Sequence, residues 1–241
     1  MLNPDLDLAG LAEDFSKRGW VCIRDAFRAD VAESIHASLR DEVPWRLSVY
    51  DNRRPPKERA VKLTMQELQQ MGQQNRAALQ AEVLRQARDQ FQYVYRSFDL
   101  LEGYRRGEAP DLFLYRLMQF LAGDVFFDFA RRLLGDQEID RIDGHATCYV
   151  AGHFLKDHAD ESPFEQRRAA YVIGMTRDWE ADMGGVLMFL DDNGRVEEAF
   201  VPGFNTITVF RVPVRHLVSE VSPWVNGQRL SVTGWLTVSG T

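Results

Sequence analysis

The spacing of apolar side chains changes near residue 140. Before that point, apolar residues recur mostly every three or four positions, which is the period of one face of a helix. This pattern predicts helices over 5–19, 30–42, 63–105 and 111–134, with a short strand at 20–27. Gly19 and Gly135 follow two of these segments, as glycines at helix ends do, and the third is interrupted near Met71 and Gly72.

From residue 142 the sequence consists of short, β-rich segments separated by turn signals such as Gly184-Gly185, Asp192-Asn193-Gly194 and Pro202-Gly203. Strands are predicted at 144–150, 153–158, 168–176, 185–190, 196–201, 206–211, 215–221 and 229–238. Eight short strands suggest a jelly roll, although an ordinary sandwich would need the same number. We therefore expect an α+β protein with a mainly β core.

The expected organisation is one domain over residues 1–241. Residues 1–139 would form a mostly helical part that packs on one face of the sheet, and residues 140–241 would form the core. A chain of 241 residues with 45% hydrophobic content can bury a core of this size.

Charge and composition exclude several classes of partner. The formal net charge is -7, and no long basic stripe is present to bind a nucleic-acid backbone. No apolar run approaches the roughly 20 residues that a membrane span requires. The two cysteines, Cys22 and Cys148, do not form a disulfide framework. We expect a cytoplasmic protein without a nucleic-acid or membrane partner.

The main candidate for chemistry is the pair His158 and Asp160. One residue separates them, so on an extended strand both side chains lie on the same face and can converge on one metal ion. His216 lies in another strand-like segment and could supply a third ligand. Two histidines and one carboxylate on one face of an ion leave three octahedral positions open, as in non-haem Fe(II) oxygenases.

A second group of polar residues follows on the last predicted strand. Arg229, Ser231, Thr233 and Trp235 alternate and therefore share one face. A guanidinium beside two hydroxyls suits a carboxylate, because planar bidentate pairing and hydroxyl donors can satisfy both oxygens.

Taken in order, these motifs resemble the Fe(II)- and 2-oxoglutarate-dependent dioxygenases of the prolyl-4-hydroxylase-like branch. The resemblance covers about residues 140–241 and rests on Tyr149, His158-x-Asp160, Gly184-Gly185-Val186-Leu187, Asn205-Thr206, His216 and Arg229-x-Ser231-x-Thr233-x-Trp235. It implies a double-stranded β-helix, which is a cupin-like jelly roll.

The resemblance also implies the roles of the site residues. His158, Asp160 and His216 would bind Fe(II), which 2-oxoglutarate chelates through its keto acid end. Arg229 would hold the far carboxylate of 2-oxoglutarate, with Ser231 or Thr233 and Tyr149 as helpers. O2 is the further cosubstrate, and L-ascorbic acid is expected to accompany the reaction.

Three functions remain open. The first is a prolyl-hydroxylase-like dioxygenase that hydroxylates an unactivated C–H of a protein or peptide side chain and releases succinate and CO2. The second is a dioxygenase of a free amino acid or other metabolite. The third is a non-catalytic regulatory module that binds iron or 2-oxoglutarate. Retention of the Asp160 carboxylate, which halogenating relatives lose, favours hydroxylation.

The remaining aromatic and histidine candidates are expected to be structural. The aromatic row Phe91, Tyr93, Tyr95 and Phe98 lies in a predicted helix and is interpreted as core rather than as a substrate wall. His36, His145 and His153 are likewise interpreted as ordinary surface or core histidines.

Overall fold

The computed structural model describes residues 1–239. Its α-helices are α1 (Leu8–Arg18), α2 (Ala29–Asp41), α3 (Met65–Gln70), α4 (Gly72–Asp89), α5 (Leu100–Arg105), α6 (Phe113–Leu121) and α7 (Asp124–Leu134). The strands are β1 (Trp20–Arg24), β2 (Arg46–Tyr50), β3 (Ala60–Thr64), β4 (Tyr93–Asp99), β5 (Arg141–Ile142), β6 (His145–Tyr149), β7 (Phe154–His158), β8 (Gln166–Met175), β9 (Leu187–Leu190), β10 (Val196–Phe200), β11 (Phe204–Arg211), β12 (His216–Val218) and β13 (Arg229–Val238). Short 3-10 turns lie at Pro56–Glu58 and Ala181–Met183. Over the described residues, no helix combines the length and apolar character needed to cross a membrane.

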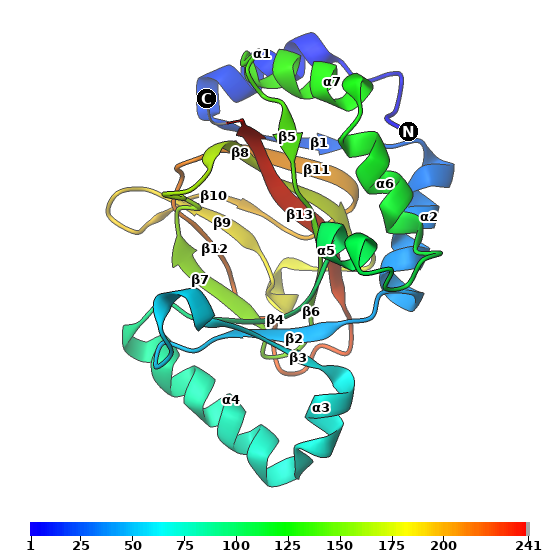
Figure 1. The fold of residues 1–241 in the computed structure, drawn as a ribbon. Coiled ribbons are helices and arrows are strands. Elements are labelled where there is room, and N and C mark those ends of the chain that lie inside the picture. Colours follow the sequence, from blue (N-terminus) through cyan, green and yellow to red (C-terminus); the bar gives the residue numbers. More distant parts are fainter. Residues whose placement is uncertain (240–241) are drawn as a thin grey trace.

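The strands form a nearly closed antiparallel barrel. Ten of them follow one hydrogen-bonded path in the order β1-β11-β8-β13-β6-β4-β7-β12-β9-β10, and β2 and β3 extend the sheet beside β4. Figure 1 shows β8, β11 and β13 on one side of the barrel and β7, β12 and β9 on the other. This arrangement confirms the predicted jelly roll.

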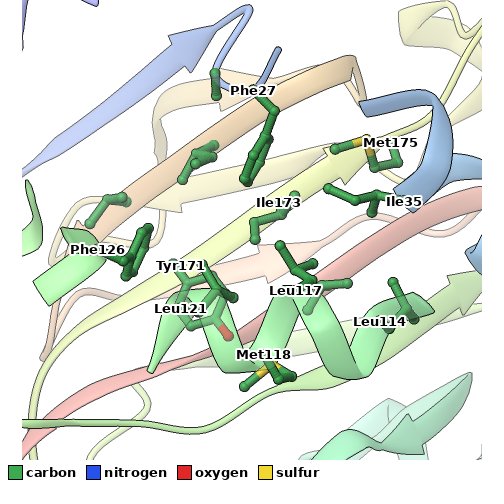
Figure 2. Close-up of a cluster of buried hydrophobic side chains, with 14 of the residues drawn as sticks. Phe27, Ile35, Leu114, Leu117, Met118, Leu121, Phe126, Tyr171, Ile173 and Met175 are labelled. Atoms are coloured by element: carbon green, nitrogen blue, oxygen red, sulfur yellow. The ribbon is translucent and has the colours of Figure 1, made fainter. Parts of the chain in front are cut away.

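Helices α1, α2, α6 and α7 cover the outer face of β8, β11 and β13 (Figure 1). In the close-up of this interface, Leu114, Leu117 and Leu121 of α6 point toward Ile173 and its neighbours on β8 (Figure 2). The side chains of Leu114, Leu117 and Ile173 are fully buried. Each such side chain contributes roughly 1.5–3 kcal/mol when it leaves water, so this layer is a major source of stability.

The opposite faces of β8 and β13 point into the barrel because side chains alternate along a strand. Val232 and Leu236 of β13 join the helix-covered core, while Arg229 and Thr233 line an internal cavity. Gly234 lies where a Cβ atom would come within 2.2 Å of the Asp143 carbonyl oxygen. This close approach explains the glycine within a strand.

All eight strands predicted after residue 142 are confirmed and correspond to β6–β13. The left-handed glycine ends are also observed: Gly19 and Gly135 cap α1 and α7 with φ values of 81° and 68°. The predicted helix at 111–134 is broken into α6 and α7 at Gly123.

The prediction of helix throughout 63–105 is wrong at residues 93–99, which form β4. Tyr93, Tyr95 and Ser97 alternate with Val94 and Arg96, which is the period of a strand. The strongly helix-forming composition of α4, which ends at Asp89, was extended too far along the chain. Strands β2 and β3 were also missed. The N-terminal region thus adds four strands to the sheet as well as its helices.

Candidate metal and cosubstrate site

A cavity of about 420 Å³ occupies the inside of the barrel. Its walls come from strands distant in sequence, chiefly β4, β6, β8 and β13, with further residues from β7 and β12. His158, Asp160 and His216 lie on one wall, and Arg229 and Tyr149 also line the cavity. The fold therefore places the predicted metal ligands and the predicted carboxylate-binding arginine around one cavity.

His158, Asp160 and His216 converge so that one ligand atom from each lies within 4.8 Å of the others. The two histidines are direct cross-strand partners in the β7–β12 pairing. Asp160 Oδ1 lies 3.3 Å from His158 Nε2, and Asp160 Oδ2 lies 3.4 Å from His216 Nε2. The carboxylate thus faces both Nε2 atoms.

Both imidazole rings are oriented by their own strands. His158 Nδ1 lies 3.0 Å from the carbonyl oxygen of Lys156, and His216 Nδ1 lies 2.8 Å from that of Val214. A carbonyl oxygen can only accept a hydrogen bond, so in the neutral ring the proton resides on Nδ1. The Nε2 lone pairs are left free toward Asp160, as binding of a metal ion requires.

The protonation states also suit a metal ion. Burial lowers the pKa of His216 to about 4, which keeps the ring neutral at physiological pH. Burial alone would raise the pKa of Asp160, but hydrogen bonding to His158 and the charges of His216 and His158 outweigh it and lower that pKa. The carboxylate is therefore ionised.

The backbone at Asp160 is in the left-handed region, with φ of 60°. Arg167 Nη1 donates a hydrogen bond of 3.2 Å to the Asp160 carbonyl oxygen, and the Arg167 guanidinium stacks 3.6 Å above the Trp235 ring. The sequence analysis did not identify Arg167, because it lies outside the His158-x-Asp160 motif and contacts Asp160 only at the backbone.

Arg229 occupies a buried position on β13 directly opposite Tyr149 of β6. Its guanidinium carbon lies 4.7 Å from the centre of the Tyr149 ring, and burial lowers the pKa of the Arg229 guanidinium. Among residues 1–239, no carboxylate lies within 4 Å of this cation. A buried cation beside a cavity, without a carboxylate partner, is suited to binding an anionic ligand.

Two of the three predicted helpers of Arg229 line the cavity, and the third does not. Tyr149 and Thr233 are in the lining. The hydroxyl of Ser231 instead lies 2.7 Å from that of Thr147, which does line the cavity. Thr147 could have been found from the sequence, because it precedes Tyr149 by two positions on the same face of β6.

Three of the four members of the aromatic row line the cavity, and one of these, Tyr95, also packs against the buried cluster around Tyr149. Phe91, Tyr93 and Tyr95 line the cavity, whereas Phe98 is buried on the opposite face of β4 under the helices. The Phe91 ring lies 5.7 Å from the His158 ring, and Tyr95 stacks on Tyr149 at 4.9 Å. We call Phe91, Tyr93 and Tyr95 the aromatic wall.

The other histidines lie apart from the metal ligands. His145 also lines the cavity, where Asp99 and Asp143 lie 3.7 and 3.8 Å from its ring nitrogens. His153 is buried just before β7, and desolvation lowers its pKa to about 4. His36 Nδ1 lies 2.8 Å from the Met175 carbonyl oxygen, in agreement with a structural role.

The donor set fits Fe(II) and 2-oxoglutarate on chemical grounds. Two imidazoles and one carboxylate are the ligands of a facial Fe(II) triad with open positions. Arg229 is unpaired with any carboxylate in the described chain and would match the far end of a dicarboxylic acid.

Comparison with known proteins agrees with this geometry. Residues 144–237 match the family model described as 2OG-Fe(II) oxygenase superfamily. The prolyl 3-hydroxylase OGFOD1 of Mus musculus is 32% identical over 121 residues, which are 46% of this chain and 22% of the relative. The Xenopus laevis OGFOD1 is 34% identical over 122 residues, or 46% and 23% of the two chains. The match thus spans less than a quarter of these curated relatives.

Solved structures share the fold over almost the whole chain. A Pseudomonas putida prolyl-4-hydroxylase has a TM-score of 0.58 at 19% identity, covering 96% of this chain and 99% of that one. A Burkholderia pseudomallei protein of the 2OG-Fe(II) oxygenase family has a TM-score of 0.62 at 14% identity, covering 98% and 93%. A Trichoplax adhaerens prolyl hydroxylase in complex with a hypoxia inducible factor peptide has a TM-score of 0.58 at 12% identity, covering 95% and 88%.

Proposed function

We propose that the chain is an Fe(II)- and 2-oxoglutarate-dependent dioxygenase of the 2OG-Fe(II) oxygenase superfamily, whose family model matches residues 144–237. The proposed reaction is hydroxylation of a prolyl residue in a protein or peptide, with consumption of O2 and release of succinate and CO2. The supporting observation is that His158, Asp160 and His216 converge in the same cavity that Arg229 lines.

Each proposed role follows from a contact. His158 and His216 would present their Nε2 atoms to Fe(II), because both Nδ1 atoms face backbone carbonyls. Asp160 would be the anionic ligand. Arg229 would pair with the distal carboxylate of 2-oxoglutarate, and Tyr149 and Thr233 would lie beside it. Bound iron supplies the activation of O2, and the protein positions the reactants and excludes water.

A polypeptide substrate is favoured by the relatives and by the cavity walls. The curated relatives are prolyl 3-hydroxylases. The aromatic wall gives flat apolar surfaces beside His158, and proline-rich segments bind in aromatic-lined grooves.

The first experiment tests the iron and 2-oxoglutarate site without any substrate. Fe(II) and 2-oxoglutarate are added anaerobically to the purified protein, and the weak charge-transfer absorption near roughly 500 nm is followed. We expect the band in wild type and its absence in His158→Ala. Binding of iron without the band would reject 2-oxoglutarate as cosubstrate, and absence of iron binding would reject the metal site.

The second experiment separates polypeptide from free substrates. Proline-containing peptides and free L-proline are each incubated with the protein, Fe(II), 2-oxoglutarate, O2 and L-ascorbic acid. Succinate release and the gain of one oxygen atom by the substrate are then measured. Turnover of peptides alone supports the proposal. Turnover of the free amino acid alone would favour the metabolite dioxygenase, and an Fe(II)–2-oxoglutarate complex without turnover of either would leave the regulatory module.

A further inference from the structure

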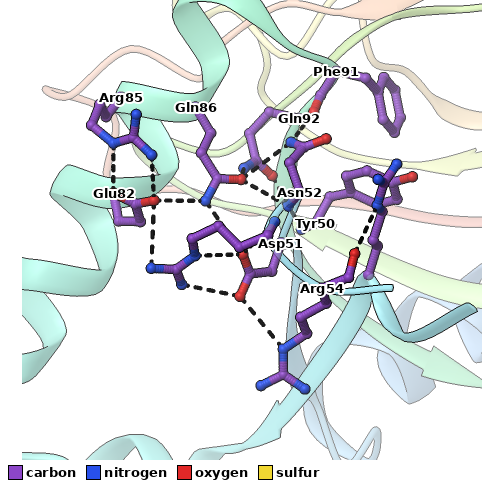
Figure 3. A network of polar contacts seen from close by, with 11 residues as sticks. Tyr50, Asp51, Asn52, Arg54, Glu82, Arg85, Gln86, Phe91 and Gln92 are labelled. Atoms are coloured by element: carbon purple, nitrogen blue, oxygen red, sulfur yellow. Dashed lines mark hydrogen bonds and ion pairs between the residues drawn. The ribbon is translucent and has the colours of Figure 1, made fainter. Parts of the chain in front are cut away.

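A buried amide network connects α4 to the aromatic wall. Its members are Gln86 of α4, Asn52 after β2 and Gln92 before β4 (Figure 3). Gln86 and Gln92 are 4% and 0% exposed, unusually low values for glutamine. None of the three lies among the residues that line the catalytic cavity.

Gln86 is the centre of this network. Its Oε1 accepts hydrogen bonds from the backbone N and the Nδ2 of Asn52, at 2.9 and 3.1 Å, and from Gln92 Nε2 at 3.4 Å. Its Nε2 donates to Glu82 Oε1 at 2.8 Å and to Asp51 Oδ1 at 3.4 Å. Both ends of the amide are therefore satisfied, and removing it would leave several buried polar groups without partners.

The network continues to the backbone of the aromatic wall. Asn52 Nδ2 donates to the Phe91 carbonyl oxygen at 2.8 Å, and Gln92 Oε1 accepts from the backbone N of Tyr93 at 2.8 Å. Gln92 Oε1 also accepts from the backbone N of Tyr50 at 3.1 Å. Phe91 and Tyr93 are thus held on either side of Gln92, and the Phe91 ring lies 5.7 Å from that of His158.

A second connection joins the same helix end to the strand of a metal ligand. Lys156 Nζ donates to the carbonyl oxygens of Ala87 and Gln90 at 2.6 and 2.8 Å. The backbone N of Lys156 donates to the Gln92 carbonyl oxygen at 3.1 Å. The C-terminal end of α4 is therefore bound to β7 as well as to the aromatic wall, so the wall and His158 share one support.

We infer that Gln86 and Asn52 are positioning residues that set the affinity for substrate by fixing the aromatic wall beside His158, without contacting substrate themselves. This inference rests on the proposed function, since it concerns how the hydroxylated polypeptide is held. It assigns α4 a part in substrate recognition although the helix lies outside the barrel (Figure 1).

The first test requires no substrate. Hydrogen exchange of backbone amides is compared for wild type, Gln86→Met and Gln74→Met; the last is the same substitution at an exposed site on α4. We expect faster exchange at 50–53 and 91–95 in Gln86→Met, unchanged exchange in β11, and wild-type behaviour in Gln74→Met. Unchanged exchange at 91–95 would overturn the inference. Asn52→Leu serves as a second variant if Gln86→Met does not fold.

The second test uses a proline-containing peptide that the wild type hydroxylates. For Gln86→Met we expect the peptide KM to rise about ten-fold, because the wall is no longer held, while kcat and the Fe(II)–2-oxoglutarate band remain within about two-fold of wild type. Phe91→Leu should raise KM similarly, and the double variant should be no worse than either single variant. A loss of kcat with unchanged KM, or additive effects on KM, would overturn the inference.

The outcomes separate this inference from the proposed function. If wild type forms the Fe(II)–2-oxoglutarate band but hydroxylates no peptide, the assignment of a polypeptide substrate fails and the claim about substrate affinity fails with it. If peptides are hydroxylated and Gln86→Met resembles Gln74→Met in both tests, only the positioning role fails.

Discussion

The two faces of β8 and β13 have opposite characters. The outer face packs Ile173 and Val232 against helices in an apolar core, whereas the inner face presents Arg229 and Thr233 of β13 to the cavity. Both faces belong to the same backbone and the same hydrogen-bonded register. Stability and ligand binding are therefore carried by alternate residues of one strand, and substitutions on the two faces should have separable effects.

The largest effect is expected on the outer face. Leu117→Ala removes a fully buried side chain of α6 from the helix–sheet interface, and it should lower the free energy of unfolding by about 2–5 kcal/mol. The protein that remains folded should form the Fe(II)–2-oxoglutarate band with unchanged affinity. Chemical denaturation and the anaerobic titration measure the two quantities, and a matched loss of 2-oxoglutarate affinity would contradict the separation of the faces.

The inner face should show the reverse behaviour. Arg229→Ala should weaken 2-oxoglutarate binding about 100-fold, or roughly 2.8 kcal/mol, because the buried carboxylate would lose its cationic partner. The metal-free protein should be no less stable, since a buried charge without a carboxylate partner is removed. Arg229→Lys keeps the charge but loses the planar guanidinium, so its affinity for 2-oxoglutarate should lie between those of wild type and Arg229→Ala. Calorimetric titration checks this order.

Acidity should destabilise the protein through His153, which lies outside the cavity. Burial lowers its folded pKa to about 4, below the ordinary value of 6.5. The unfolded chain therefore binds the proton first, and this contribution is present above pH 6.5 and lost as pH falls toward 4. The loss should be about 3 kcal/mol. Urea unfolding of wild type and His153→Gln across this range measures it; an equally steep decline in the variant would contradict the assignment to His153.

The smallest effect is expected for Ser231, which lies on the inner face of β13 but does not line the cavity. Ser231→Ala removes the hydroxyl that lies 2.7 Å from that of Thr147, at an expected cost of about 0.5–1.5 kcal/mol in unfolding free energy. We expect less than a three-fold change in 2-oxoglutarate affinity, because the hydroxyl is already engaged. Thr233→Val, at a residue that lines the cavity, is the comparison variant. A larger loss of affinity in Ser231→Ala would restore the helper role predicted from the sequence.

The strands of the jelly-roll half were predicted well, because each has a local signal: alternating apolar and polar residues, with turn residues at its ends. It also predicted which residues gather: His158, Asp160, His216 and Arg229 are separated by up to 71 positions in the chain, yet the structure brings them to one cavity. The resemblance to the 2-oxoglutarate-dependent dioxygenases, which rests on the order and spacing of these motifs, implied that they share one site.

What could not be predicted depends on long-range register. The Thr147–Ser231 contact joins residues 84 positions apart, and the network of Asn52, Gln86 and Gln92 exists only once β2, α4 and β4 are adjacent. For β4, the period-two spacing of Phe91, Tyr93 and Tyr95 was available but was outweighed by the helix-forming residues that precede it.

Each histidine of the triad is oriented by a hydrogen bond within its own segment of three consecutive residues. His158 is held by the carbonyl of Lys156 and His216 by that of Val214, each two positions earlier in the chain. These two hydrogen bonds involve no side chain of the aromatic wall. Substitutions at Phe91 or Tyr93 would leave both hydrogen bonds in place while they change the cavity surface beside His158. Such a scaffold can diversify its substrates without rebuilding its reactive centre.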